Sequence, residues 1–254
     1  MKKSACFLLT RGYSFRQKHK YLLLIVRNWA ARRILNKEFE FLDFLIFHEG
    51  NISRFDQHMI RILSFNLRIV FVDISEIFTI PRDFVWTGNS KYSLGYSLMC
   101  RFNYLQVWQF LGDYEWVIRV DEDCILKSIP KIDSLGNFTV GAIARESHEP
   151  TNSTLPTVLE SLNVGHLYDQ KFPYTNVYIT KPKHWLQPDV QDFLEKVGSE
   201  SVCLEYRWGD LPILGVTAKK FLNWDWKEGF SKDLVYWHRS HRHMVLGDNQ
   251  ILDF

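Results

Sequence analysis

Three consecutive acids, Asp121, Glu122 and Asp123, are the residues of this sequence best suited to chemistry, and they follow a short apolar segment. Residues 116–120 are aromatic or β-branched for the most part, which predicts a buried strand. Ligands of open α/β sheets bind at the carboxyl ends of strands. Side chains alternate along an extended chain, so we expect Asp121 and Asp123 to point one way and Glu122 the other. Two such carboxylates can hold Mg²⁺ or Mn²⁺ against a diphosphate. A solvated acidic turn is the alternative.

The elements that must position these acids alternate between strand and helix. The order strand, helix, strand, helix, strand before the acids predicts a parallel sheet with right-handed crossovers. Further elements follow the acids, and we predict a single α/β domain over residues 1–254. The predicted strands are 5–10, 41–47, 68–72, 116–120, 138–144 and 174–180, the predicted helices 17–37, 53–65, 93–110 and 184–197, and the predicted loops 74–90 and 148–154.

The first predicted strand ends at Thr10 and Arg11. In open α/β folds a nucleotide commonly lies over the end of this strand. Thr10 and Arg11 are therefore candidates to bind the nucleotide part of a donor.

Composition excludes several classes of protein. Of the 254 residues, 46% are hydrophobic and 24% charged, as in a soluble globular protein, and a net charge of +2 gives no indication of nucleic-acid binding. The four cysteines are dispersed, which favours reduced thiols and a cytoplasmic location. No apolar run is long enough to span a bilayer. The basic side of the helix at 17–37 leaves peripheral contact with an anionic membrane open, with a solvated face as the alternative.

Four segments, in order, resemble the fungal α-1,2-mannosyltransferases of glycosyltransferase family 15, and a fifth, Val235-Tyr-Trp-His238, is a weaker match to that family's Y-Y-H. The R-W-G-D-x-P and M-C-R-F elements are the most specific of these matches. The four segments are Tyr96-Ser-Leu-Met-Cys-Arg-Phe102 (family Y-R-H-M-C-R-F/Y), Asp113-Tyr-Glu-Trp-Val-Ile-Arg-Val-Asp-Glu-Asp123 (D-Y-E-W-Y-W-R-V-E-P-D), Thr175-Asn-Val-Tyr-Ile179 (S-N-F-E-I) and Tyr206-Arg-Trp-Gly-Asp-Leu-Pro212 (E-R-W-G-D-A-P).

The resemblance implies a GT-A type fold, with a mostly parallel central sheet flanked by helices. It also implies a nucleotide-sugar donor, GDP-mannose in the family, and Mn²⁺ (or Mg²⁺) bound to the donor diphosphate. By position, Asp121 and Asp123 match the family's acidic pair, and His238 matches its metal-ligand histidine. Tyr96 and Arg101 match donor-site residues.

Two further groups of residues bear on the donor site. Arg101 and Arg207 are suited to charge-assisted hydrogen bonds with phosphate, although a structural ion pair is an equal alternative for Arg207. His238 lies near His241 and His243 in the sequence. Histidine-rich chain ends are often only solvated, and the resemblance supports His238 alone.

The family's S-N-F-E-I carries the carboxylate proposed to act at the anomeric carbon, and this chain has Tyr178 there. A phenol titrates near ~10, so Tyr178 carries no charge at neutral pH, and a retaining mechanism does not follow from the resemblance. Asp210, which matches the Asp of R-W-G-D and follows a glycine, is the favoured base, and a helix N-cap is its structural alternative. Glu205 and the departing diphosphate itself are the other candidate bases.

The sequence thus predicts a metal-dependent glycosyltransferase that moves a sugar, preferably mannose from GDP-mannose, to a glycan, glycolipid or other hydroxyl acceptor. Two other classes stay open. An acid-cluster phosphotransfer enzyme is one, although a nucleophilic Asp usually follows the first strand of such folds. A catalytically inactive nucleotide-sugar binding protein is the other, because of Tyr178. The sequence does not identify the acceptor.

Overall fold

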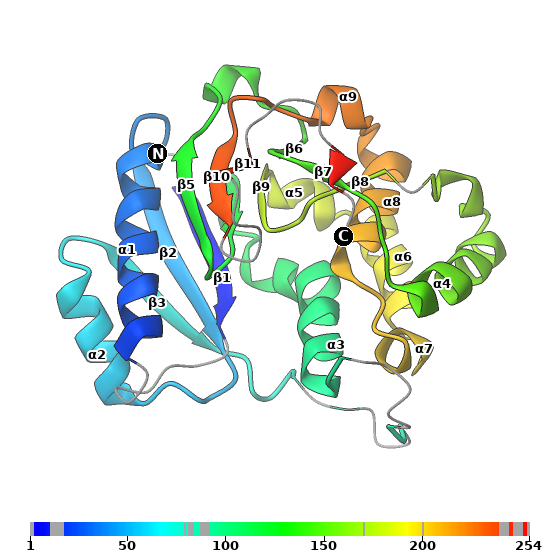
Figure 1. Cartoon of the computed structure of the whole chain (residues 1–254), viewed down its shortest axis with the longest axis horizontal. Helices are drawn as coiled ribbons and strands as arrows, with labels where there is room; N and C mark the ends of the chain where they lie inside the picture. The colour runs from blue at the N-terminus through cyan, green and yellow to red at the C-terminus, as the bar shows by residue number, and fades with distance from the viewer. Residues whose placement is uncertain are drawn as a thin grey trace.

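A six-stranded sheet, in the order β3-β2-β1-β4-β9-β6, forms the centre of the computed structural model (Figure 1). The structure describes residues 3–10, 18–78, 80, 84–86, 92–169, 171–199, 201–238, 244–245 and 251–252. β9 is antiparallel to both of its neighbours, and the other strands of this sheet share one direction. The predicted mostly parallel sheet is therefore confirmed. Its strands are β1 (Lys3–Thr10), β2 (Phe41–His48), β3 (Arg68–Asp73), β4 (Trp116–Val120), β6 (Phe138–Val140) and β9 (Val177–Thr180).

Helices cover both faces of this sheet. Alternate residues of β1 divide between two buried clusters: Phe7 packs with the later helices, whereas Leu8 packs with α1 on the opposite face. Figure 1 shows α1 and α2 together along one side of the molecule and the later helices beyond the sheet. The helices are α1 (Lys18–Leu35), α2 (Arg54–Leu63), α3 (Leu94–Arg101), α4 (Glu149–Ser161), α5 (Pro182–Trp185), α6 (Pro188–Ser199), α7 (Ser201–Glu205), α8 (Asp210–Leu222) and α9 (Trp226–Gly229).

Two small sheets complete the fold. β5 (Cys124–Ser128) starts just after the acids and pairs antiparallel with β10 (Val235–His238), which also pairs with β11 (Met244–Val245). In this register His238 lies opposite Cys124. The pairing of β5 with β10 thus brings His238 beside the acids. The other small sheet contains β7 (Ile143–Ala144), β8 (Phe172–Pro173) and β12 (Ile251–Leu252).

Several predicted elements differ from the structure. The helix expected at 184–197 is two helices, α5 and α6, with α6 beginning at Pro188. The helix expected at 93–110 is α3 followed by a π-helical segment, 102–106, and a 3₁₀ segment, 107–110. The strand expected at 138–144 is divided into β6 and β7. Between them Gly141 approaches Leu234, just before β10, so closely that a Cβ there would lie 2.2 Å from the Leu234 carbonyl oxygen. β9 begins at Val177, three residues later than expected from 174–180.

The polar loop expected at 148–154 is wrong, since these residues begin α4. Pro150 lies in the first turn of this helix, where its missing N–H costs no hydrogen bond. Leu155 and Leu159, four residues apart, are buried on one face and hold the helix against the core. Part of the loop expected at 74–90 lies outside the described residues.

Arg27 connects α1 to the end of the acidic strand. Its side chain is fully buried, and its guanidinium donates through Nε to the Val120 carbonyl over 3.1 Å and through Nη2 to the Phe7 carbonyl over 3.3 Å. Val120 directly precedes Asp121, so this contact fixes the strand end from which the acids extend.

All four cysteines are buried with free thiols. None of the described helices is both long and apolar enough to cross a membrane.

We expect Arg27→Met to lower the free energy of unfolding by about 2–4 kcal/mol, because it leaves buried carbonyls without donors. Urea denaturation followed by circular dichroism measures this change. Arg33→Met, on the exposed side of the same helix, is the matched control and should stay within about 0.5 kcal/mol of the parent. Equal losses in the two variants would contradict the structural role of Arg27.

Candidate active site

A cleft of about 940 Å³ opens at the carboxyl ends of β1 and β4. This is the edge of the sheet at which the acids were predicted to lie. All three acids line the cleft, and most of the other predicted site residues do as well. Those others are Thr10, Tyr96, Arg207, Asp210 and His238.

The acids lie in a turn and each has a different neighbour. The Cys124 amide donates to the Asp121 carbonyl over 3.0 Å, which closes a turn over residues 121–124. Glu122 therefore also faces the cleft, where its carboxylate accepts from the Thr10 hydroxyl over 3.0 Å. The expected alternation, with Glu122 pointing away, is wrong because these residues are not extended.

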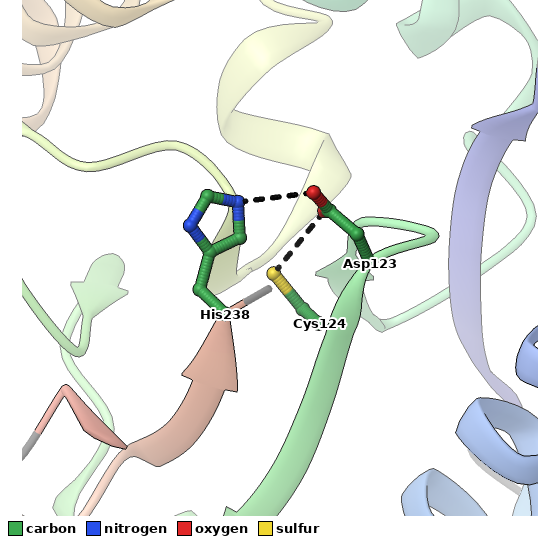
Figure 2. Close-up of side chains that lie close together, drawn as sticks. All are labelled: Asp123, Cys124 and His238. Atoms are coloured by element: carbon green, nitrogen blue, oxygen red, sulfur yellow. Dashed lines mark hydrogen bonds and ion pairs between the residues drawn. The ribbon is translucent and has the colours of Figure 1, made fainter. Parts of the chain in front are cut away.

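Asp123 lies beside His238, which comes from the far end of the described chain (Figure 2). The Asp123 Oδ2 is 3.3 Å from the His238 Nε2, and the Asn176 Nδ2 is 3.2 Å from the same nitrogen. Cys124 is the third member of the cluster, with its Sγ 3.9 Å from the Asp123 Oδ1. One ligand atom from each of Asp123, Cys124 and His238 lies within 4.8 Å of the other two.

This donor set fits a divalent cation of intermediate hardness. A carboxylate oxygen and an imidazole nitrogen form a mixed set that suits Mn²⁺ better than Mg²⁺. Burial, with the neighbouring Asp121 and Asp123 carboxylates, raises the pKa of the Cys124 thiol well above its usual value. The thiol is also a softer donor than a carboxylate or an imidazole and is therefore less suited to Mn²⁺. Asp121 lies outside this cluster among the described residues, and its role as a metal ligand stays a prediction.

Asp121 is instead held by Arg119. The Arg119 Nε donates to the Asp121 Oδ1 over 2.7 Å and its Nη2 to the Oδ2 over 3.3 Å, while its Nη1 binds the Asp210 Oδ2. Burial disfavours the Arg119 cation, but the two carboxylates more than offset this and keep its pKa well above the usual value. Burial raises the pKa of Asp121 to about 6, and Arg119 opposes that shift.

Sequence reasoning missed Arg119, although a signal was present. Arg119 is the only charged residue in the five-residue strand β4, and it lies two positions before Asp121 on the same face. A lone charge in a buried strand needs a partner of opposite charge. Asn176, which also lines the cleft, stands at the Asn of the S-N-F-E-I match but was not singled out. No local pattern marks Glu146, another lining residue.

Arg207 forms one wall of the cleft with two tyrosines. Tyr92 and Tyr96 stack with their ring centres 4.9 Å apart, and the guanidinium carbon of Arg207 lies 4.3 Å and 5.1 Å from those centres. Arg207 has a left-handed φ of 51°, and its Nη1 is 3.5 Å from the Glu146 Oε1. The structure thus places the predicted donor residues Tyr96 and Arg207 side by side. The neighbouring Glu146 also fits the alternative interpretation, in which Arg207 forms a structural ion pair.

Asp210 is the first residue of α8, with Gly209 as the N-cap. Gly209 has an ordinary extended φ of −68°, so the turn does not depend on its backbone freedom. A side chain at Gly209 would bring its first carbon to 3.1 Å from the Glu146 Oε2, so glycine is favoured here by close approach. Asp210 itself is 13% exposed and lines the cleft beside Arg119.

Three predicted residues do not line the cleft, and a fourth is outside the described part of the chain. Tyr178 is fully buried in the core, with its ring 6.1 Å from that of Phe7 and 5.2 Å from that of Phe138. Arg101 and Glu205 are absent from the cleft lining. Arg11, like His241 and His243, lies outside the described residues. The roles of Arg101, Glu205 and Arg11 stay predictions.

We expect Arg119→Met to lower the free energy of unfolding by about 3–5 kcal/mol, because it leaves two partly buried carboxylates beside each other without a cation. Chemical denaturation at neutral pH tests this. Lys196→Met is the control, since Lys196 forms an exposed ion pair with Asp192 at 2.7 Å and should contribute only about 0.5 kcal/mol. A loss from Arg119→Met as small as that of the control would contradict the importance of the buried pairs.

No protein-family model and no curated protein sequence matches this chain. Core-mannan synthase A (CmsA/Ktr4) from Aspergillus fumigatus, in its Mn/GDP form, resembles it with a TM-score of 0.72 and 13% identity over 94% of this chain and 75% of that one. The mannosyltransferase Ktr4p from S. cerevisiae in complex with GDP has a TM-score of 0.73 and 16% sequence identity, over 94% of this chain and 71% of that one. Mouse xyloside xylosyltransferase 1 has a TM-score of 0.55 and 14% sequence identity, over 90% of this chain and 84% of that one. The chain therefore has a GT-A type fold, as predicted.

Proposed function

We propose that this protein is a metal-dependent glycosyltransferase of the family 15 type, which transfers a sugar from a nucleotide-sugar donor to a hydroxyl acceptor. The observation that carries the proposal is the meeting of Asp123 and His238 in the cleft. The sequence resemblance assigned both residues to one metal site, although they lie in different parts of the chain. Their 3.3 Å separation is independent support for that assignment.

The solved structures that share the fold favour a particular donor. Two of them are mannosyltransferase-type proteins whose structures contain GDP, and one of these also contains Mn. The motifs of this chain resemble the same family. We therefore propose GDP-mannose as the donor and Mn²⁺ as the cofactor, held by Asp123 and His238. The acceptor, a glycan, glycolipid or other hydroxyl compound, is proposed from the resemblance alone.

The described residues can perform the binding steps of this reaction. Arg207 presents a cation at the cleft wall and is suited to charge-assisted hydrogen bonds with a diphosphate. The stacked rings of Tyr92 and Tyr96 support this guanidinium and orient it. The Thr10 hydroxyl, at the end of β1, donates to the Glu122 carboxylate in the cleft lining. A divalent cation bound at Asp123 and His238 would act as a Lewis acid toward the charge of the leaving diphosphate.

Asp210 is best placed to receive the acceptor proton. It lines the cleft, whereas Tyr178 is buried and Glu205 is not in the lining. Arg119 binds the Asp210 Oδ2 and so restricts the orientation of the carboxylate. A general base must lie within hydrogen-bond reach of the hydroxyl that it deprotonates, and of these three only Asp210 has access to the cleft.

We expect Mn²⁺-dependent release of GDP from GDP-mannose, slow with water alone and faster with a hydroxyl acceptor. Asp123→Ala and His238→Ala should each weaken Mn²⁺-dependent donor binding about a hundredfold. Each substitution removes one metal ligand, and such a contact contributes a few kcal/mol to the binding free energy. Calorimetry with GDP-mannose, with and without Mn²⁺, measures this. His184→Ala, outside the cleft lining, is the matched histidine control and should bind as the parent does.

The same assay separates the other two classes. An inactive binding protein would bind the donor with Mn²⁺ and show no turnover with any acceptor. A phosphotransfer enzyme would hydrolyse phosphate esters and show no preference for sugar nucleotides. Donor affinity that is unchanged in both Asp123→Ala and His238→Ala would contradict the proposed metal site.

A second expectation concerns the base. Asp210→Asn should lower turnover by about 10²–10⁴-fold with little change in donor affinity, because the amide keeps the shape and cannot accept the proton. Tyr178→Phe should have a small effect, since the ring contacts in the core remain. Single-turnover kinetics with saturating donor distinguishes the two variants. A crippled Tyr178→Phe beside a tolerated Asp210→Asn would reverse this assignment of roles.

A further inference from the structure

The outer surfaces of α1 and α2 expose an unusual number of large apolar side chains. Leu22 is 58% exposed, Phe55 62% and Phe65, just after α2, 66%. Isolated exposed apolar residues are common on soluble proteins, whereas a contiguous group indicates a binding surface. We call this group the α1–α2 surface, and its apolar residues are Leu22, Val26, Trp29, Phe55, Ile62, Leu63 and Phe65.

These residues form adjoining stripes on two neighbouring helices. Leu22, Val26 and Trp29 recur at the i, i+4 and i+7 positions of α1, so they share one helix face. The Trp29 indole Nε1 lies 3.4 Å from the Leu63 carbonyl, and the Arg32 Nη1 lies 2.5 Å from the Asn66 carbonyl. Figure 1 shows the two helices side by side at one edge of the molecule.

The charges on the α1–α2 surface are of one sign. The sequence of α1 contains no acid, and the only acid of α2, Asp56, is buried against the Ser53 cap. Arg33 is exposed four residues after Trp29 on the same face of α1, and Arg54 is exposed next to Phe55 in the sequence. Arg61 is exposed as well, with its guanidinium over the Phe71 ring. The nearest following acids, Glu38 and Glu40, lie beyond the end of α1, and the Glu38 carboxylate accepts from the Ile132 amide on another element.

We propose that the α1–α2 surface docks the protein on an anionic lipid bilayer. Aromatic and aliphatic side chains that insert at the headgroup level, surrounded by arginines, are the features by which interfacial helices bind such membranes. The presence of Trp29 fits this location, because tryptophan is enriched at membrane interfaces. Cations surrounding the apolar residues match the negative potential of the lipid surface.

The same charges disfavour the other occupants. In a two-fold symmetric dimer each copy presents the same surface to the other. Arginines of one copy would then face arginines of the next, with no exposed acid on either helix to offset the repulsion. A nucleic acid would satisfy the cations, but it would leave the exposed aliphatic side chains without partners. This inference is independent of the proposed sugar transfer, since none of the α1–α2 surface residues lines the cleft.

The test is co-sedimentation of the whole chain with vesicles of phosphatidylcholine, with and without phosphatidylglycerol. The parent should bind the anionic vesicles, bind neutral ones weakly and be partly released by high salt. We expect the double variant Val26→Ser with Phe65→Ser to lower the partition coefficient at least about tenfold, because two inserted apolar side chains are lost. We expect a similar decrease for Arg33→Glu with Arg54→Glu, because each basic residue near an anionic surface contributes about 1 kcal/mol to binding. Circular dichroism checks that each variant is folded.

Matched controls lie elsewhere on the surface. Ile80→Ser with Val85→Ser removes two exposed apolar side chains, and Lys183→Glu with Lys232→Glu reverses two exposed charges. Both controls should bind anionic vesicles as the parent does. The inference is overturned if the parent does not bind anionic vesicles, or if the controls lose binding as much as the α1–α2 variants. It is also overturned if sedimentation velocity shows a dimer that Val26→Ser with Phe65→Ser dissociates, since a second copy would then occupy the surface.

Discussion

The pairing of one buried guanidinium with two carboxylates is the interaction on which the site depends. Arg119 projects from the central strand β4 and binds both Asp121, at the end of that strand, and Asp210, at the start of α8. Without it the two carboxylates would repel each other in a partly buried site. The Arg119 cation therefore links the end of β4 to the start of α8 through one carboxylate from each. Arg27 acts behind the same strand end, where it binds the Val120 carbonyl.

Strand register is the second constraint, because it decides whether His238 reaches the acids. β10 pairs with β5 so that His238 lies opposite Cys124, directly after Asp123. A shift of one residue would turn the imidazole to the other face of the strand. The register is maintained by the buried side chains of Leu126 and Tyr236, which are direct partners in this pairing. The core packing of a small sheet thus fixes a contact between the middle and the end of the chain.

Much of the fold was predictable from local sequence, and the site less so. The first four strands were found because each is a short apolar run bounded by polar or turn residues, as at Phe41–His48. α4 was missed because its polar first turn resembles a loop, although Leu155 and Leu159 carry helical spacing. His238 could be assigned only through the family resemblance, since no local pattern pairs it with Asp123. The orientation of Glu122 could not be predicted, because a hydrogen bond formed only in the folded turn rotates it toward Thr10.

The position of Tyr178 shows how the charge of the cleft is limited. Tyr178 is the direct partner of Arg119 across β4 and β9, and the Arg119 guanidinium carbon lies 5.9 Å from its ring centre. A carboxylate there would be a third acid competing for one guanidinium already shared by Asp121 and Asp210, whereas a phenol adds no charge and fills the space between Phe7 and Phe138. In this chain the ring keeps the layer beneath Arg119 apolar. The negative charge beside Arg119 therefore comes from Asp121 and Asp210. Asp121 belongs to the turn that also contains the proposed metal ligand Asp123, whereas Asp210 begins a separate element, α8.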